Sequence, residues 1–288
     1  MKDTFYMPLT AAPFRKNEVY KEVLPKNPEL AKYIRCFWGS EIPYVIKEKR
    51  NAGDIVVPDT CADIIYHIDH TDHLITGGFC GINDAAFSDC HREETGHLVS
   101  VFAIRFYAWG VYAFSEDSLK DTINGYFDVQ SRFWWLDHLL RSQLLEKNTL
   151  EERIKTAEAM FVRKLPGIKQ HSVIDKAVHH IIRNKGRQSA VELAGECFVS
   201  SRQLQRLFHE YIGITPKKLS NLIRYQYLWN EIITDTQFDV QDAVHRYGFT
   251  DQSHLLREFK RYHTMDIQTA KNYAHKDVQN IQYQQHEN

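Results

Sequence analysis

Polar side chains that can bond to the edges of DNA bases stand at helical spacing twice in the C-terminal part of the sequence. The first group is Ser201, Arg202, Gln205 and Arg206, and the second is Gln252, Ser253, His254 and Arg257. An arginine can donate two hydrogen bonds to O6 and N7 of guanine, and a glutamine can pair with N6 and N7 of adenine. Two helices that present these groups outward would be suited to reading a major groove.

Each group shares its segment with an apolar stripe that would hold the helix in place. At 3.6 residues per turn, the apolar residues on one face are Leu204, Leu207, Phe208 and Tyr211 in the first segment, and Leu255, Phe259 and Tyr262 in the second. A shorter helix is expected before each one, over Val191–Cys197 and Val240–Tyr247. Ser200, and either Thr250 or Asp251, can cap the two longer helices.

Two explanations fit a single unit of this kind: a helix-turn-helix, or an ordinary helical bundle with a solvated polar face. The repetition favours the first explanation, because a bundle need not repeat the same arrangement further along the chain. The sequence therefore predicts a tandem helix-turn-helix domain.

At these residues the sequence resembles the C-terminal DNA-binding domain of AraC-type transcription regulators, over residues 172–275. The matching motifs are ELA, VSSRQLQRLFHEYIGITP, Arg224 and RYGFTDQSHLLREFKRY. The resemblance implies that the two groups above contact bases or phosphates, and that one long helix, Pro216–Ile233, bridges the units. Three places depart from the family pattern: Asn230, Leu256, and Thr264–Ile267 at the end of the second unit.

The N-terminal part is expected to be rich in β-structure. Short runs rich in Val, Ile, Phe and Tyr are separated by Gly, Asp, Asn and Pro, which is typical of an antiparallel sandwich or small barrel. The expected strands are Tyr44–Glu48, Ile55–Val57, Ala62–Ile68, His73–Thr76 and Leu98–Phe106, with a hairpin turn at residues 69–72. This part resembles, more loosely, the N-terminal half of some AraC-type regulators, through PELAKYIRCFW, VPDTCADIIYHI and VFAIRFYAWG.

The resemblance implies an α+β chain, in which a cupin-like antiparallel β-barrel sensor domain over residues 1–130 precedes the all-α domain. The residues available to line a ligand pocket are Trp38, Tyr66, Arg105 and Tyr107. Arg105 could meet an anionic group. The aromatic residues could equally form the core of the barrel.

Between the two domains the pattern becomes helical again over residues 131–165. One apolar stripe contains Phe133, Leu136, Leu139, Leu140 and Leu144, and another contains Ile154, Ala157, Phe161 and Leu165. Such helices either dimerise, as the resemblance implies, or pack on their own barrel. Thr149 and Glu152 form a capping box. Residues 166–171 are expected to be a linker, and residues 276–288 a polar tail.

Two loose sets of residues could bind a metal. His67, Asp69, His70, Asp72 and His73 lie around the predicted hairpin turn, where three imidazoles cannot easily reach one ion. Cys80, Cys90, His91 and His97 lack the paired spacing of a structural zinc site. We expect no metal and no cofactor, and we predict that the chain is not an enzyme. A metal-dependent cupin enzyme fused to a DNA-binding domain is the alternative from another class.

Composition and charge agree with a two-domain globular protein. The chain has 288 residues and a net charge of −1. Residues 171–288 hold 15 Lys and Arg against 13 Asp and Glu, a net of +2, so the remainder carries −3. Affinity for DNA must therefore come from locally placed cations. No apolar run reaches the length of a membrane span and no signal-peptide core is present, so we expect a cytoplasmic protein without a membrane partner.

The sequence as a whole predicts a sequence-specific DNA-binding transcription regulator controlled by a small molecule. Its expected partners are double-stranded DNA, a small-molecule effector, RNA polymerase and a second copy of the chain, and we expect an activator. A regulator controlled by its abundance or by a protein partner is the alternative. The bridging helix would be about 27 Å long, shorter than the roughly 34 Å between successive major-groove segments. A bent operator, or readout dominated by the first unit, is expected.

Overall fold

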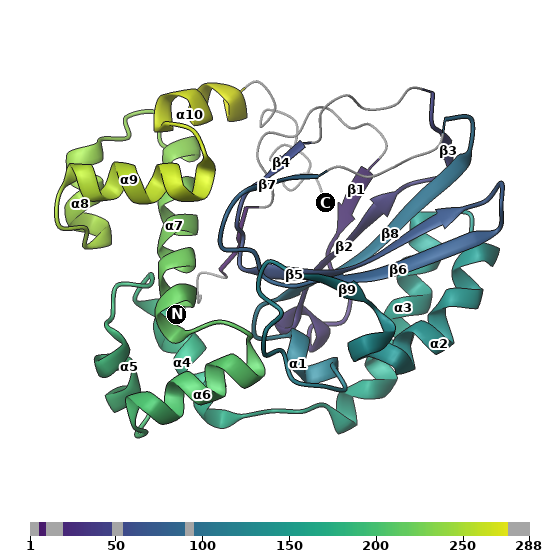
Figure 1. Cartoon of the computed structure of the whole chain (residues 1–288), viewed down its shortest axis with the longest axis horizontal. Helices are drawn as coiled ribbons and strands as arrows, with labels where there is room; N and C mark the ends of the chain where they lie inside the picture. Colours follow the sequence, from purple (N-terminus) through teal and green to yellow (C-terminus); the bar gives the residue numbers. More distant parts are fainter. Residues whose placement is uncertain (1–5, 10–19, 48–53, 90–94, 276–288) are drawn as a thin grey trace.

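The computed structural model describes residues 6–9, 20–47, 54–89 and 95–275. An N-terminal antiparallel β domain is followed by an all-α domain, as predicted (Figure 1). The polar tail at 276–288 lies outside the described residues. In the part of the chain that the structure describes, no helix is long and apolar enough to span a membrane.

Seven strands form the main sheet, with the path β1-β2-β8-β5-β6-β9 and with β3 paired to β8. Its strands are β1 (Tyr20–Val23), β2 (Ile34–Ser40), β3 (Tyr44–Val45), β5 (Cys61–Asp69), β6 (Leu74–Cys80), β8 (Leu98–Tyr107) and β9 (Tyr126–Asp128). A second sheet pairs β4 (Asp54–Val56) with β7 (Phe87–Asp89). The path of the main sheet begins at β1 and ends at β9, and these two strands are not paired with each other among the described residues.

Two helices cover one face of the main sheet, α2 (Gln130–Glu146) and α3 (Leu150–Lys164). Thr149 and Glu152 form the predicted capping box at the start of α3. Phe161 of α3 is fully buried and packs against Phe106 of β8, with ring centroids 5.7 Å apart. Phe133 of α2 stacks on the same Phe106 ring at 6.0 Å.

The predicted apolar stripes of these helices are therefore used inside their own domain. In α2 the buried members include Phe133, Leu136, Leu140 and Leu144, and in α3 they include Ile154, Ala157 and Phe161. Of the two open alternatives, the structure shows packing on the sheet. Trp134 and Leu139 remain exposed on the outer side of α2, so a dimer built on this helix would have to use that outer side.

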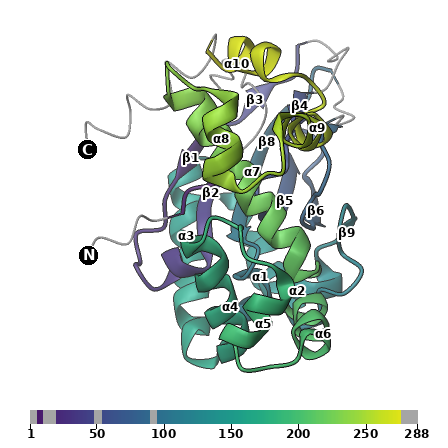
Figure 2. The ribbon, with the colours of Figure 1, turned by 90° about the vertical axis from the view of Figure 1, so that its left-hand side faces the viewer.

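The C-terminal domain consists of seven α-helices in the described residues. They are α4 (Ser172–Arg183), α5 (Ala190–Glu196), α6 (Ser201–Tyr211), α7 (Pro216–Thr234), α8 (Val240–Tyr247), α9 (Gln252–His263) and α10 (Ile267–His275). Helix α7 has buried residues along its whole length, and α6 and α9 lie at its opposite ends in both views (Figures 1 and 2). The remaining short elements are α1 (Val111–Phe114) and the 3-10 turns η1 (Leu30–Lys32) and η2 (Leu165–Gly167).

The two domains are joined by polar contacts as well as by the chain itself. The buried amide of Gln226 in α7 accepts a hydrogen bond from Leu9 N (2.8 Å) and donates to the carbonyl oxygens of Leu9 (3.3 Å) and Pro58 (2.6 Å). Near the start of α7, Lys218 forms an ion pair with Asp84 at 2.6 Å. A third contact joins the domains at α6, where the N–H of Leu119 donates to the carbonyl oxygen of Glu210 (3.0 Å).

Truncation of Phe161 tests whether α3 belongs to the core of its own domain. We expect Phe161→Ala to destabilise the N-terminal domain by about 3–5 kcal/mol, because it empties a site enclosed by aromatic rings. The neighbouring Val162 is 37% exposed, so Val162→Ala should change stability by about 0.5 kcal/mol or less. Urea unfolding of both variants measures the difference. Equal small losses would show that α3 is not part of this core.

Candidate nucleic-acid interface

The first unit is α5, a tight turn and α6. Ser189 and Glu192 form a capping box at the start of α5. Phe198 in the turn takes a left-handed conformation (φ 56°), and Ser200 caps α6 by accepting a hydrogen bond from Gln203 N (3.2 Å). These caps satisfy backbone groups at the helix ends, and they fix the point at which α6 begins.

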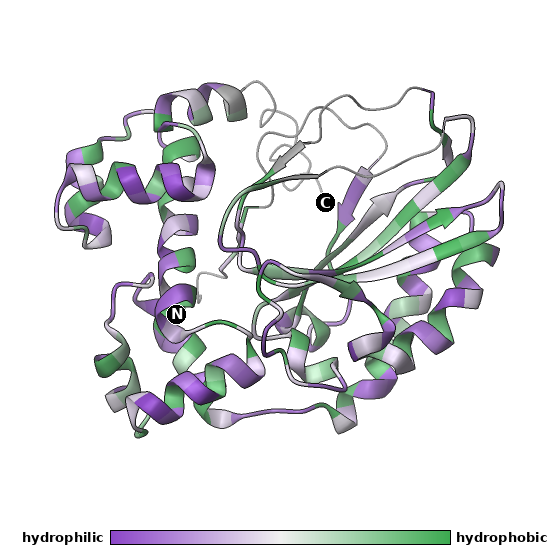
Figure 3. Cartoon of the chain, viewed as in Figure 1, coloured by the Kyte–Doolittle hydropathy of each residue, from purple (hydrophilic) through white to green (hydrophobic). Residues whose placement is uncertain are grey.

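Helix α6 presents two distinct faces. Leu204, Leu207 and Phe208 are buried against the domain. Of the predicted contact residues, Arg202, Gln205 and Arg206 are exposed, and Ser201 is half-buried at the start of the helix. The predicted polar face therefore lies free of the domain core, and the hydrophilic outer side of α6 is visible in Figure 3.

The second unit repeats this construction with different residues. Asp239 caps α8, and Gly248 ends it in the left-handed conformation (φ 68°). Of the two candidate caps for α9, the structure shows Asp251, whose carboxylate accepts a hydrogen bond from His254 N (2.7 Å). Leu255, Phe259 and Tyr262 are buried, as predicted.

The predicted contact residues of α9 differ in how far their side chains are exposed. Gln252, Ser253 and Arg257 are exposed. His254 is half-buried, because its ring lies edge-on against Phe249 and its Nε2 is 3.3 Å from a carboxylate oxygen of Glu258. Base contact by His254 would therefore compete with contacts inside the domain.

A nearly buried ion pair fastens α9 to α7. The Nη2 atom of Arg224 lies 2.9 Å from Glu258, and both side chains are only about one-tenth exposed. The Arg224 guanidinium also lies over the Phe249 ring, 4.4 Å from its centroid. Arg224, which the family motif singles out in the bridging helix, therefore holds the second reading helix in place.

The end of the second unit has the backbone geometry of the first, although its residues depart from the family pattern. After α6, Gly213 takes a left-handed conformation (φ 84°) and Thr215 caps α7. After α9, Thr264 takes the left-handed conformation (φ 65°), and Asp266 accepts a hydrogen bond from Thr269 N (2.9 Å) in the first turn of α10. Thr264 and Asp266 thus replace Gly213 and Thr215.

The burial of His263, at the end of α9, was not expected from its residue type or its spacing. It is fully buried between α9 and α7, where its ring lies 4.4 Å from Trp229 and its Nδ1 shares a 2.8 Å hydrogen bond with the hydroxyl of Tyr225. Burial lowers the pKa of His263 to about 4, because the charged imidazolium is poorly solvated there. The second unit is therefore built around a neutral histidine.

The structure brings together only part of the ligand-binding set predicted for the N-terminal domain. Arg105 and Tyr107 share one face of β8, and Trp38 lies on that same face of β2, where the Arg105 guanidinium is 6.0 Å from its ring. Asp63, which pairs with Arg105, lies three residues from Tyr66 along β5, so Tyr66 points to the opposite face of the sheet, towards Asp137 of α2. Tyr107 is covered by Trp109, stacked at 4.7 Å.

Arg105 is not free to meet an anionic group. Its Nε lies 2.9 Å from Asp63 and its Nη1 lies 3.3 Å from Asp59. Trp38 Nε1 donates to the same Asp63 at 2.8 Å. Burial raises the pKa of Asp59 to about 6, and the nearby guanidinium of Arg105 opposes this effect only in part. The sequence could not show this pairing, because it depends on the register of β5 and β8.

The hairpin turn does not gather the predicted histidines around one point. Within the described residues, possible ligand atoms of Asp69, Asp72 and His97 lie within 4.8 Å of one another. His97 Nδ1 donates a 2.6 Å hydrogen bond to the carboxylate of Asp69, and His70 bonds to Ser100 instead. Cys90 and His91 of the second predicted set lie outside the described residues.

The family comparison agrees with this architecture. A model described as a helix-turn-helix domain matches residues 193–271, which cover both units apart from the first residues of α5. The C-terminal domain is therefore an AraC-type helix-turn-helix domain. A model described as a domain of unknown function matches residues 21–128, which cover most of the β domain. No curated protein matches the chain.

Three solved structures show limited likeness to this chain. A transcriptional regulator from Chromobacterium violaceum is 21% identical over 35% of this chain and 91% of its own, with a TM-score of 0.33. A probable AraC family regulator from Rhodopseudomonas palustris is 20% identical over 36% and 98%, with a TM-score of 0.33. ToxT from Vibrio cholerae is 12% identical over 82% and 98%, with a TM-score of 0.40. The assignment rests on the AraC-type motifs and the family match, because these scores are too low to support it.

The neutral His263 makes a pH-dependent contribution to stability. The unfolded chain binds a proton at this residue near its ordinary pKa of about 6.5, whereas the folded chain does so only near 4. The unfolded state therefore binds more protons between these values, and stability is lost as the pH falls through this window. At pH 5 we expect a loss of about 2 kcal/mol relative to pH 7. Urea unfolding at both pH values should show a smaller loss in His263→Gln, which cannot titrate there.

Thr264 tests the left-handed end of α9. A β-branched residue in this conformation is strained, whereas glycine is not, although glycine costs more conformational entropy on folding. We expect Thr264→Gly to stabilise the domain by about 0.5–1 kcal/mol, and Thr264→Val to destabilise it. Thermal unfolding measures both. A loss of stability in the glycine variant would contradict the conformation seen here.

Proposed function

We propose that this AraC-type regulator is sequence-specific and reads two neighbouring major-groove segments with α6 and α9. The observation that supports this most strongly is the exposure of the same polar types on both helices. Arg202, Gln205 and Arg206 face outward in α6, and Gln252, Ser253 and Arg257 do so in α9. Arginine and glutamine are the side chains with bidentate base contacts in the major groove.

The spacing of the two reading helices constrains the DNA that can bind. Helix α7 has 19 residues, one more than predicted. Its length is therefore about 28 Å, and it is buried and rigid. Successive major-groove segments on one face of straight B-DNA lie roughly 34 Å apart. The operator is bent, or the first unit dominates the base readout.

Each helix leaves three predicted contact residues exposed, but α9 offers one arginine among them where α6 offers two, which favours dominance by the first unit. His254 is engaged with Phe249 and Glu258, and Leu256 exposes an apolar side chain on the same helix. Neither feature occurs at the corresponding part of α6, where Arg202, Gln205 and Arg206 are all exposed. Readout by α6 therefore carries more of the specificity.

Control by a small molecule completes the proposed function. Gln226 and the Lys218–Asp84 ion pair tie the β domain to the helix between the two units, so a change in this joint would alter how α6 and α9 are held. A homodimer and RNA polymerase remain the expected partners. Control by abundance or by a protein partner is the alternative, and a thermal-shift screen of small metabolites separates it from ligand control.

Arg206 and Arg257 test the reading helices against each other. On a site selected from a random duplex library, we expect Arg206→Ala to weaken binding by about 1–3 kcal/mol and to relax the preference at one base pair. Arg257→Ala should cost less. Arg163→Ala, which removes an exposed arginine from α3 in the other domain, is the matched control and should bind normally. Titrations on selected and random DNA measure the effects.

Three outcomes would count against this proposal. An equal loss of Arg206→Ala affinity on random DNA would make this residue a phosphate contact. Equal losses for the two arginines on a site that gel mobility shows to be unbent would contradict the geometric argument. Normal binding by both variants would remove α6 and α9 from the interface.

A further inference from the structure

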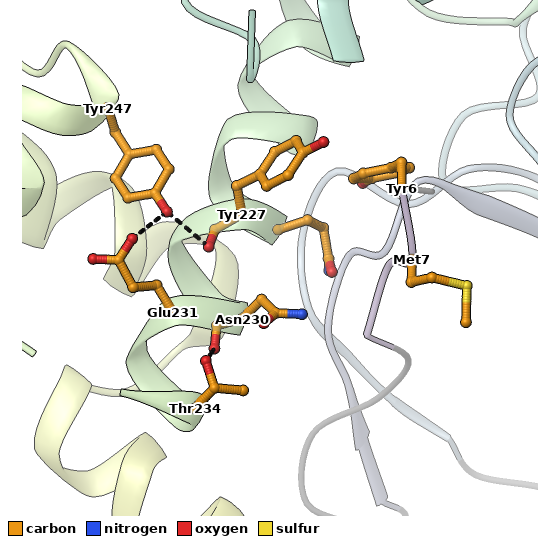
Figure 4. A pocket seen from close by; sticks show the side chains of 8 residues that line it. Tyr6, Met7, Tyr227, Asn230, Glu231, Thr234 and Tyr247 are labelled. Atoms are coloured by element: carbon orange, nitrogen blue, oxygen red, sulfur yellow. Dashed lines mark hydrogen bonds between the residues drawn. The ribbon is translucent and has the colours of Figure 1, made fainter. Parts of the chain in front are cut away.

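A cavity lies between the N-terminal segment and the helix that bridges the two DNA-reading units. Its volume is about 290 Å³, near the lower end of small-molecule sites. Its walls come from both domains and are lined by Tyr6, Met7, Gln226, Tyr227, Asn230, Glu231, Thr234 and Tyr247. Figure 4 shows these side chains around the space between α7 and the segment that carries Tyr6 and Met7.

The polar groups of this cavity are already engaged, with one exception. The Tyr247 hydroxyl donates to Glu231 (2.5 Å) and lies 3.1 Å from the carbonyl oxygen of Tyr227, and Arg246 forms an ion pair with Glu231. The Thr234 hydroxyl donates to the carbonyl oxygen of Asn230 (2.8 Å). The amide of Gln226 is bonded to Leu9 and Pro58, as described above.

The exception is the side-chain amide of Asn230. It makes no side-chain hydrogen bond in the part of the chain that the structure describes, and it points from α7 towards the segment with Tyr6 and Met7 (Figure 4). Asn230 is also one of the residues that depart from the family pattern. A half-buried amide beside aromatic rings offers one donor edge and one acceptor to whatever enters.

The charge of the walls limits the class of ligand. Glu231 is the one acidic or basic side chain among the lining residues, and Arg246 already neutralises it. An anion would meet this carboxylate, and a cation would have to displace Arg246. Tyr6 and Tyr227, whose ring centroids are 5.5 Å apart, supply apolar surface next to the amide.

We infer that this cavity binds a small uncharged molecule with an apolar ring and an amide-like edge, anchored by Asn230. The inference rests on the proposed control by a small molecule, and it places the effector at the joint between the domains. Because Tyr6 and Met7 belong to one domain and α7 to the other, an occupant contacts both sides of the joint at once.

The test uses benzamide as the probe and the full-length chain labelled with ¹³C-methyl methionine. The chain has four methionines, of which Met7 lines the cavity and Met160 and Met265 do not. Benzamide should shift the Met7 methyl signal saturably and leave the other two unchanged. Benzoate and benzylammonium, of similar size but charged, should not shift it. Met7→Leu assigns the signal.

Asn230→Ala tests the anchor. The variant should keep the fold, since alanine is the best helix former, and thermal unfolding checks this. Benzamide should bind it about threefold to tenfold more weakly, as expected for the loss of one or two hydrogen bonds. Asn221→Ala, on the same helix but outside the cavity, is the matched control and should bind benzamide as the natural chain does.

Each outcome decides the matter. No saturable shift of Met7, equal binding of the charged probes, or equal affinity of the Asn230→Ala variant overturns the inference. Benzamide at saturation should also change the dissociation constant for the selected DNA in the natural chain and not in Asn230→Ala. An unchanged constant overturns the effector role. Failure to bind DNA both with and without benzamide counts against the proposed function alone, because the methionine signal does not depend on DNA.

Discussion

Burial of helix α7 on all sides is the constraint on which the rest of the C-terminal domain depends. Eleven of its 19 residues are buried, and they include positions on every side, such as Leu222, Ile223, Tyr225 and Leu228. A helix with buried positions all round its circumference must be enclosed by other elements of the domain. Helices α4, α6, α8 and α10 pack against it. The two reading helices are therefore held at a separation that α7 sets.

The same burial explains why a single polar residue in α7 can orient the two domains. A buried amide without partners would cost several kcal/mol, so Gln226 requires its hydrogen bonds to Leu9 and Pro58. These partners belong to the N-terminal segment and to the chain before β5. The β domain therefore contacts α7 in one orientation, and the contacts of Asp84 with Lys218 and of Leu119 with Glu210 follow from it.

Sequence patterns predicted the C-terminal domain well because its signals are local. Caps such as Ser200 and Asp251, and the apolar spacing of α6 and α9, depend on residues a few positions apart. The end of the second unit could not be predicted in this way, because Thr264 in a left-handed conformation has no reliable sequence signal. His263 was missed because its burial arises from Tyr225 and Trp229, which lie on another helix.

The β domain was harder to predict because its information lies in pairings between distant residues. Strand β2 has no alternating pattern, since Ile34, Cys36 and Phe37 are all fully buried, and its apolar run was not assigned to a strand. Tyr66 and Arg105 both have side chains that would suit the lining of a ligand pocket. Only the register of β5 with β8 shows that they point to opposite faces.

The pairing of Arg105 also decides what the sheet face around it can recognise. One guanidinium stands beside two carboxylates, Asp59 and Asp63, so the cluster has no positive charge to offer an anion. Burial raises the pKa of Asp59 to about 6, which brings the cluster closer to neutrality as the pH falls towards that value. Trp38 is bonded to Asp63 and adds no spare donor there. A ligand on this face would have to break existing hydrogen bonds. A ligand beside Asn230 would instead form hydrogen bonds with a side-chain amide that makes none among the described residues. The cost of desolvating polar groups therefore favours the joint between the domains over the face of the sheet as the place where a small molecule acts.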